Sequence, residues 1–288
     1  MYSLVGGGFQ INILDSLPIT FPFMCGRYSL TADGADLWEL IEGKLPKPAR
    51  DGLSQEQVSL VMQAAERRRY NIVPTSLEPI LYLHEGRTVF APAFWWLLPS
   101  WGSNQVTWRR SKSGDKTFTW KETRKSHFNS RWDTVTNPSN HYWHGLLDSK
   151  RCLIPADGFV EWPDDALRPK DQEKIPHYFS LHEHRPFFFA GIYDIATDDE
   201  GNSFVSYNII TVEPNQMLKR LPHHRMPAIL SDEAIARWIS PTVHAEEAGK
   251  LLKPTGDDLM VEYPISKLVN TPKNESPAVL LPLGDHSG

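Results

Sequence analysis

Two long apolar β patterns constrain the fold of this 288-residue chain more than any other feature. They run from Phe187 to Ile195 and from Phe204 to Val212, and the polar residues 198–202 between them suit a turn. Segments of this length that face each other across a turn predict an antiparallel hairpin with a buried face. The chain is therefore expected to build its core from β-sheet.

Shorter β patterns precede and follow this hairpin. A Glu85-Gly86 turn predicts a second hairpin, and the Trp-rich, Pro-broken run 94–101 predicts a buried strand that leads into a loop. The other expected strands are a first strand near Arg27, Arg151 to Pro155, Phe159 to Trp162 and one strand after residue 260. A charged, Pro-containing loop is expected over 163–176.

Helical periodicity is confined to short segments. The expected helices are 34–43, 54–68, 141–150, 214–221, a helix that begins after an N-cap at Ser231, and 243–252. The chain shows no internal repeat and no Gly/Ser linker. We therefore predict one α+β domain over 24–275, β-rich, with mostly antiparallel, barrel-like sheets and peripheral helices, an N-terminal extension over 1–23 and a C-terminal tail over 276–288.

The composition excludes several classes of protein. Ten Trp and 23 Pro favour a β-rich and loop-rich fold over a helical bundle. Two cysteines, Cys25 and Cys152, provide neither a disulfide framework nor a zinc site, which favours a reducing compartment. No apolar run approaches the roughly 20 residues that span a bilayer, and residues 1–23 lack the basic start of a secretion signal. We expect a nuclear or cytoplasmic protein.

Positive charge is concentrated in one stretch, although the formal net charge of −5 argues against a general polyanion binder. Residues 107–131 contain eight Lys or Arg and two Asp or Glu, together with Trp108, Phe118 and Trp120. Basic side chains interleaved with aromatic ones suit a phosphate backbone and unpaired bases. A solvated, mobile loop is the alternative interpretation.

The stretch Met24-Cys25-Gly26-Arg27 has a conditional chemistry. If translation begins at Met24, or if the preceding residues are removed, Cys25 becomes an N-terminal 1,2-aminothiol. Such a group captures an aldehyde as a Schiff base and closes on it as a thiazolidine, which an internal Cys cannot do. Residues 1–23 are then a removed segment such as a propeptide, a mis-annotated start, or a dispensable tail.

Three further stretches place a reactive residue beside turn-forming or small neighbours: 128–131, 157–162 and 223–227. Each residue has an ordinary alternative. Cys25 suits a small buried hydrophobe, Asn129 a turn, Glu161 the outward position of a strand and His223 a helix C-terminus.

With their spacing, these stretches resemble one family, the SOS-response-associated peptidase-like (SRAP) proteins, which sense abasic sites in single-stranded DNA. The resemblance runs from Met24 to about Leu283 and rests on eight motifs in order. They are MCGRY (24–28), YNIVPT (70–75), WWLLPSW (95–101), FNSR (128–131), RCLIPADGFVEW (151–162), AGIYD (190–194), HHRMPAIL (223–230) and PISKLVN (264–270).

The resemblance implies a catalytic set. Cys25 is the nucleophile through its α-amine and thiol, Glu161 accepts a proton from the amine, and His223 donates one to the sugar oxygen. Asn129 holds the opened sugar and the amine in register. No metal or cofactor is implied.

The resemblance also implies a DNA path. Its expected residues are Arg27, Arg131 and Arg225 for the phosphates, and Asn71, Pro74, Trp101 and Thr211 along the strand. For Trp101, packing in the core is the alternative. The expected partners are single-stranded DNA with abasic sites and replication-associated proteins, with no membrane, and the expected state is a monomer.

Three readings of function remain open at this stage. The first is a sensor that crosslinks to abasic DNA, with a lyase-like activity; the second is a thiol peptidase or autopeptidase that uses Cys25 and His223; the third is a non-covalent single-stranded DNA binder. The sequence departs from the family pattern at Asp133, where Glu is usual, at Trp132, at Trp96, where Gly is common, and in a long basic insert over 103–125.

Overall fold

A computed structural model describes residues 25–101, 106–110, 116–120, 128–168, 170–171, 173–197, 201 and 203–284, with 106–110 and 116–120 described as backbone only. The strands are β1 (Tyr28–Leu30), β2 (Arg69–Ile72), β3 (Leu77–His84), β4 (Arg87–Trp95), β5 (Val106–Arg110), β6 (Lys116–Trp120), β7 (Asn129–Arg131), β8 (Arg151–Ala156), β9 (Gly158–Glu161), β10 (His177–Leu181), β11 (Phe187–Thr197), β12 (Ser203–Val212), β13 (Met226–Pro227) and β14 (Met260–Pro264). The helices are α1 (Gly34–Lys44), α2 (Lys47–Asp51), α3 (Gln55–Glu66), α4 (Trp132–Val135), α5 (His141–Ser149), α6 (Gln216–Arg220), α7 (Asp232–Ile239) and α8 (Ala245–Gly249). Short 3₁₀ turns lie at His182–His184, Asp257–Leu259, Lys267–Asn270 and Pro277–Val279.

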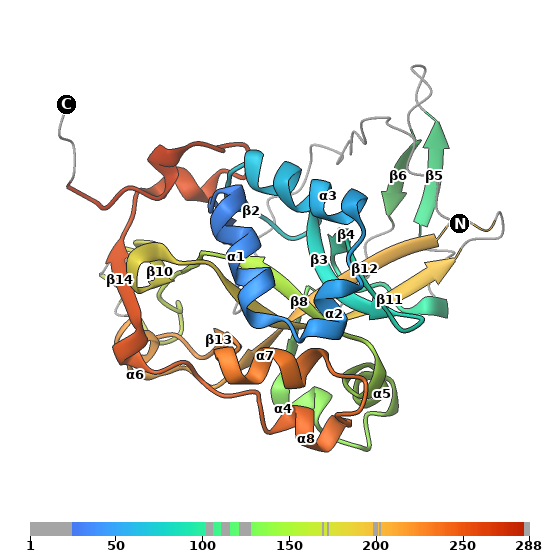
Figure 1. Cartoon of the computed structure of the whole chain (residues 1–288). Coiled ribbons are helices and arrows are strands. Elements are labelled where there is room, and N and C mark those ends of the chain that lie inside the picture. The colour runs from blue at the N-terminus through green and yellow to red at the C-terminus, as the bar shows by residue number, and fades with distance from the viewer. Residues whose placement is uncertain are drawn as a thin grey trace.

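The larger sheet closes on itself as a barrel (Figure 1). Its strands follow the order β11-β8-β3-β4-β12, and β12 pairs with β11 to complete the ring. The β11–β12 hairpin is the one predicted from the two long apolar patterns. All pairings in the barrel are antiparallel except that of β4 with β12, which is parallel. The predicted α+β class with mostly antiparallel, barrel-like sheets is confirmed.

The second sheet brings the N-terminal strand beside the strand that ends at Glu161. Its order is β14-β10-β9-β1-β2, and Tyr28 of β1 lies opposite Phe159 of β9. A small second core, made of Val160, Tyr178, Ile265, Val269 and Val279, lies against this sheet. Residues 276–284 therefore lie near β14, where the backbone N–H of Leu283 donates to the carbonyl of Pro264.

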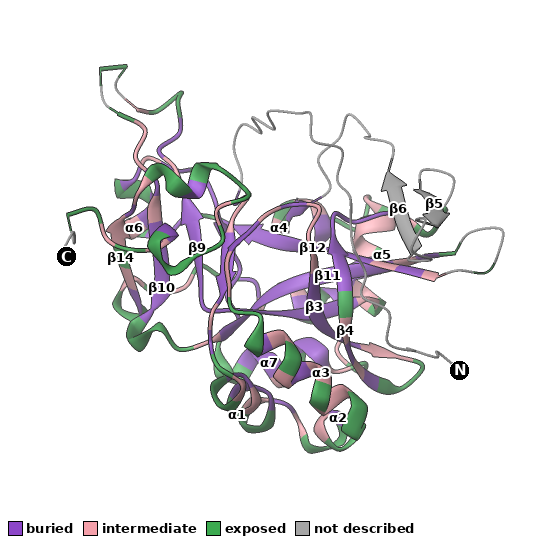
Figure 2. Cartoon of the chain, turned by 90° about the horizontal axis from the view of Figure 1, so that it is seen from above, coloured by how far each residue is buried: buried purple, intermediate pink, exposed green. Residues whose placement is uncertain are grey.

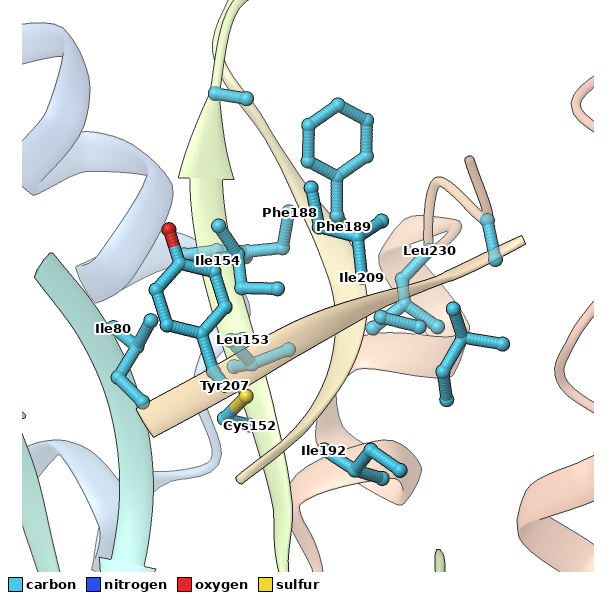
Figure 3. Close-up of a cluster of buried hydrophobic side chains, with 14 of the residues drawn as sticks. Ile80, Cys152, Leu153, Ile154, Phe188, Phe189, Ile192, Tyr207, Ile209 and Leu230 are labelled. Carbon is cyan, nitrogen blue, oxygen red and sulfur yellow. The ribbon is translucent and has the colours of Figure 1, made fainter. Parts of the chain in front are cut away.

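The barrel interior is filled by side chains (Figure 3). Phe189, Ile154 and Tyr207 from three different strands lie on the same face of the sheet and are all buried, and Cys152 lies beside them. Burial raises the pKa of the Cys152 thiol well above its usual value. The second cysteine is therefore a core residue and not a reactive thiolate.

Helices cover the outside of the sheets, with their exposed faces at the periphery (Figure 2). Asp33 caps α1 through its carboxylate, and Ser54 with Gln57 forms a capping box on α3. Ser231 lies at the N-cap position of α7, as predicted, but its side chain makes no capping hydrogen bond. Among the described residues, no helix is both long enough and apolar enough to cross a membrane.

Several short elements were not predicted from the sequence. Strand β10 follows the expected loop, and helices α2 and α4 have five and four residues. Strand β4 ends at Trp95, so the run 94–101 is a strand end followed by irregular backbone, although residues 94–98 are buried. Elements this short have little periodicity and depend on tertiary contacts for their stability.

Gly191 lies where β8, β11 and β12 come together, which makes it a test of the barrel. A Cβ atom at this position would lie 2.8 Å from the backbone oxygen of Asn208 and 2.9 Å from the Cys152 Sγ. We expect Gly191→Ala to lower the free energy of unfolding by about 1–3 kcal/mol because the crowded atoms must shift. Urea denaturation measures this loss. Gly145→Ala in α5 is the control, since a Cβ there meets nothing within 4 Å and is expected to be neutral or stabilising; equal effects of the two substitutions would contradict the packing described.

Candidate functional site

Cys25 is buried at the start of the described chain, just before β1. Its side chain is 1% exposed, and its backbone carbonyl accepts a hydrogen bond of 2.6 Å from Asn129 Nδ2. Burial raises the pKa of the Cys25 thiol, and the charge of Glu161 raises it further. The thiol is therefore held in its protonated form, close to the Glu161 carboxyl. Cys25 is therefore buried, as the alternative interpretation of a small buried hydrophobe predicted. Its neighbours, however, are Asn129 and Glu161, which are predicted site residues.

Glu161 and His223 form a buried acid–base pair beside this cysteine. Glu161 Oε2 lies 3.2 Å from His223 Nε2, and both side chains are buried. The Nδ1–H of His223 donates to the carbonyl of Trp162 over 3.1 Å, so the neutral ring has its lone pair at Nε2. Burial raises the pKa of the Glu161 carboxyl well above its usual value and lowers that of His223 to about 4. Burial thus favours an uncharged pair, a carboxylic acid beside a neutral imidazole.

Three buried polar atoms at this site have no hydrogen-bond partner among the residues that the structure describes. They are Asn129 Oδ1, Glu161 Oε1 and His223 Nε2; the last is near Glu161 Oε2 but not aligned with it as a hydrogen bond. Buried polar groups are nearly always hydrogen-bonded because their desolvation is costly. One unpartnered atom on each of three neighbouring side chains is the pattern of a site built to bind a polar ligand.

Backbone pairing holds Cys25 and Glu161 together. The backbone N–H of Val160 donates to the Arg27 carbonyl over 3.0 Å, which fixes β9 against the chain two residues after Cys25. Asp157, in the turn between β8 and β9, accepts hydrogen bonds from Ser29 Oγ, from the N–H and hydroxyl of Thr31 and from the N–H of Ala32. The sequence suggested only a turn at Asp157; that an acidic turn residue organises the neighbouring strand required knowledge of the β1–β9 pairing.

Arg131 ends strand β7 and Arg225 comes directly before β13, and both strands pair with β12 at Thr211. In the parallel pairing of β7 with β12, Asn129 lies opposite Ile209 and Arg131 opposite Thr211. Arg225 Nη2 donates to the Thr211 carbonyl over 2.6 Å, and the charge of Arg131 contributes to lowering the pKa of Arg225 after burial. Each guanidinium group also has a carboxylate partner, Asp133 for Arg131 and Glu213, at 3.1 Å, for Arg225. Both carboxylates are partly exposed, and a phosphate could compete with them for the two arginines.

Asp133, where the family usually has Glu, still holds Arg131 through two hydrogen bonds. Arg131 Nε and Nη2 donate to the two carboxylate oxygens of Asp133 over 3.0 and 2.7 Å. The shorter carboxylate therefore makes the same two-point contact that a planar guanidinium allows. Trp96, where Gly is common in the family, is buried against Phe128, the residue before Asn129.

Arg27 and Asn71 meet at the carbonyl of Val269. Arg27 Nε donates to this oxygen over 3.5 Å, and Asn71 Nδ2 donates to it over 3.2 Å and also to the carbonyls of Thr271 and Asn274. Burial lowers the pKa of Arg27 to about 10, so the group stays cationic at neutral pH. Asn71 is itself buried, and its side chain holds the segment 269–274 on which Arg27 rests.

Of the remaining predicted DNA-path residues, Thr211 lies with Arg131 and Arg225. Thr211 is buried, and its hydroxyl donates to the Ser130 carbonyl; Pro74 is also buried. Trp101 is 66% exposed and lies edge-on to Tyr142, with ring centroids 4.4 Å apart. The alternative that Trp101 packs in the core is therefore wrong. A direct contact of these residues with DNA stays a prediction.

Comparison with known proteins identifies the family. The family described as SOS response associated peptidase (SRAP) matches residues 24–272. The chain belongs to the SRAP family. Among its SRAP relatives, the abasic site processing protein YoqW of Bacillus subtilis (strain 168) is 31% identical over 260 residues, which cover 89% of this chain and 99% of that protein. The abasic site processing protein HMCES of Gallus gallus is 30% identical over 285 residues, covering 90% and 78%.

A solved structure shares the fold. The crystal structure of a protein from Bacteroides thetaiotaomicron matches this SRAP chain with a TM-score of 0.64 and 25% identity, over 90% of this chain and 99% of that one. In the part of the chain that the structure describes, no group of three or more His, Cys, Asp or Glu side chains is arranged to hold a metal ion.

The protonation state of His223 is directly measurable. Because burial lowers its pKa to about 4 while an unfolded His titrates near 6.5, the native state binds fewer protons than the unfolded state between these values. We expect the His223 ring resonance to stay unchanged by NMR down to about pH 5, and the native state to lose stability as the pH falls from about 6.5 to about 4. His223→Gln assigns the resonance and should remove this part of the pH dependence. A midpoint near pH 6.5 for His223 would contradict the uncharged pair.

Proposed function

We propose that this chain, once Cys25 carries a free α-amine, captures abasic sites in single-stranded DNA as a covalent thiazolidine. The observation that carries the proposal is the set of unpartnered atoms of Asn129, Glu161 and His223 gathered around Cys25. The names of the relatives YoqW and HMCES, abasic site processing proteins, support the same substrate. The finer expectations of a monomer, of replication-associated partners and of a nuclear or cytoplasmic location go with this proposal.

The reaction balances with the loss of one water. The closed sugar opens when its C1′–O4′ bond breaks: O4′ gains a proton and the hydroxyl on C1′ loses one to water, which leaves an aldehyde at C1′. The Cys25 amine adds to this carbon and water leaves, giving an imine. The Cys25 thiol then adds across the C=N bond: sulfur bonds to C1′ and the nitrogen takes the proton. The product is a five-membered ring that contains both the nitrogen and the sulfur of Cys25.

The Glu161–His223 pair supplies the protons in a definite order. A neutral His223 has a lone pair and no proton at Nε2, so it cannot donate to the sugar directly. Glu161, whose pKa burial raises, holds a proton and lies 3.2 Å from Nε2. We propose that this proton passes through Nε2 to the sugar oxygen. The carboxylate left behind then accepts a proton from the Cys25 amine, which restores the nucleophile.

Asn129 and the arginines position the substrate. Asn129 Nδ2 already holds the Cys25 carbonyl, so its unpartnered Oδ1 is oriented to accept a hydrogen bond from the amine or from a hydroxyl of the opened sugar. Arg131 and Arg225 next to it suit the phosphates that flank a missing base, and Arg27 suits a third.

The crosslink itself is the test. Protein that begins at Cys25 is incubated with single-stranded DNA carrying one abasic site, and heat-stable complex is counted on a denaturing gel. We expect complex with wild type and none with Cys25→Ala, because the ring needs both the amine and the thiol. Glu161→Gln and His223→Gln are expected to slow formation by about 10²–10⁴. Full-length chain in which Cys25 remains internal is the matched control; equal yields from that chain or from Cys25→Ala would overturn the proposal.

Self-cleavage before Cys25 is the second candidate, since Cys25 and the Glu161–His223 pair provide a thiol with an acid–base pair close by. It has a physical obstacle: burial and Glu161 raise the thiol pKa, whereas a nucleophilic cysteine needs the thiolate. N-terminal sequencing of full-length protein decides the matter. Self-cleavage predicts a wild type that begins at Cys25 and Cys25→Ala and His223→Ala variants that retain the preceding residues; loss of these residues from all three excludes it.

A further inference from the structure

Strands β5 and β6 form a separate two-stranded sheet whose two faces differ sharply in chemistry (Figure 1). In their antiparallel register, Val106 lies opposite Trp120, Trp108 opposite Phe118 and Arg110 opposite Lys116. Directly opposed residues share a face and neighbours along a strand alternate, so these six residues occupy one face. The other face carries Thr107, Arg109, Thr117 and Thr119.

One face of this ribbon therefore combines three aromatic residues with two basic ones, and the other is mostly threonine. Aromatic and basic residues on one face suit unpaired nucleotides, since bases stack on aromatic rings and phosphates pair with Arg and Lys. The pattern becomes two-sided only when the register of the strands is known.

The segment that contains the ribbon is basic, whereas the rest of the chain is acidic. Residues 102–127 contain seven Lys or Arg and two Asp or Glu, a net charge of +5, so the rest of the chain carries −10. A polyanion is attracted to this stretch. The aromatic residues among the basic ones favour a nucleic-acid strand over an acidic protein surface, because bases stack on aromatic rings.

The ribbon is inserted between two elements of the candidate DNA site. In the sequence, the ribbon comes after the exposed Trp101 and before Phe128 and Asn129. Asn129 bonds to the Cys25 carbonyl, and Arg131 follows two residues later. The ribbon is thus flanked in the sequence by residues that the proposed function places along the DNA.

We propose that the aromatic–basic face of the β5–β6 ribbon binds single-stranded DNA that adjoins the abasic site. The inference rests on the proposed function only for the identity of the DNA, because the ribbon takes no part in the chemistry at Cys25. It provides non-covalent affinity through Trp108, Phe118 and Trp120 and salt-dependent attraction through Arg110 and Lys116.

The test uses DNA without an abasic site, so that crosslinking cannot contribute. Binding of the full chain to a labelled oligonucleotide of about 20 nucleotides, and to one of about 6, is measured by fluorescence anisotropy. We expect the combined variant Trp108→Ala, Phe118→Ala, Trp120→Ala to weaken binding of the longer strand about 10- to 100-fold and of the shorter strand much less. The matched control, Thr107→Ala, Thr117→Ala, Thr119→Ala, alters the other face of the same two strands and is expected to change affinity less than about 3-fold. Equal losses from the two combined variants, or no loss from the first, would overturn the proposal.

A second pair of variants leaves the aromatic residues in place and guards against unfolding of the ribbon. Arg110 and Arg109 are neighbours on opposite faces. We expect Arg110→Gln to reduce the slope of log affinity against log salt by about 0.7, the contribution of one phosphate contact to a single strand, and Arg109→Gln to leave it unchanged. Identical slopes for the two variants would contradict the assignment of the face. If no crosslink forms, the two binding experiments still test the ribbon, because they use DNA without an abasic site. If the binding experiments fail, the proposal of crosslinking through Cys25 is not affected.

Discussion

The antiparallel pairing of β1 with β9 is the contact on which the site depends. It places Tyr28 opposite Phe159, so that the residues before β1 run beside the end of β9, where Glu161 lies. Asp157 secures this pairing through the side chain of Ser29 and the backbone of Ala32. Without this pairing, nothing would hold the Cys25 thiol close to the Glu161 carboxyl in the protein interior. Everything proposed about proton transfer follows from that proximity.

The barrel strand β12 has the corresponding role for the substrate side. It pairs with β11 to close the ring, and its far end pairs with both β7 and β13. Asn129, Arg131 and Thr211 are thereby fixed to a strand of the rigid core, and Arg225 is bound to Thr211. Side chains held in place before a ligand arrives lower the entropy cost of binding, which would favour the proposed contact with DNA. One sheet therefore positions Cys25 and Glu161, the proposed nucleophile and its proton acceptor. The other positions Asn129 and Arg131, which are proposed to orient the DNA.

The sequence predicted the long elements and the chemical identity of the site residues, but not their arrangement. The β11–β12 hairpin was predictable because its apolar runs are long, whereas β7 and β13, with three and two residues, have no periodicity of their own. Asn129, Glu161 and His223 could be named from motifs and family resemblance. That burial favours an uncharged Glu161–His223 pair depends on desolvation, which a sequence does not display. The roles of Asp157 and of the Asn71 side chain were likewise invisible, because both act on residues far away in the chain.

The central claim is that the α-amine and thiol of one residue, Cys25, together hold the abasic sugar. The most direct measurement is mass spectrometry of the adduct formed by the native protein with abasic single-stranded DNA, after digestion of both protein and DNA. The account predicts a peptide that begins at Cys25 and is heavier by the sugar remnant less one water, with no free thiol on that residue. An adduct on a lysine elsewhere, or on a peptide that still contains Met24, would contradict it.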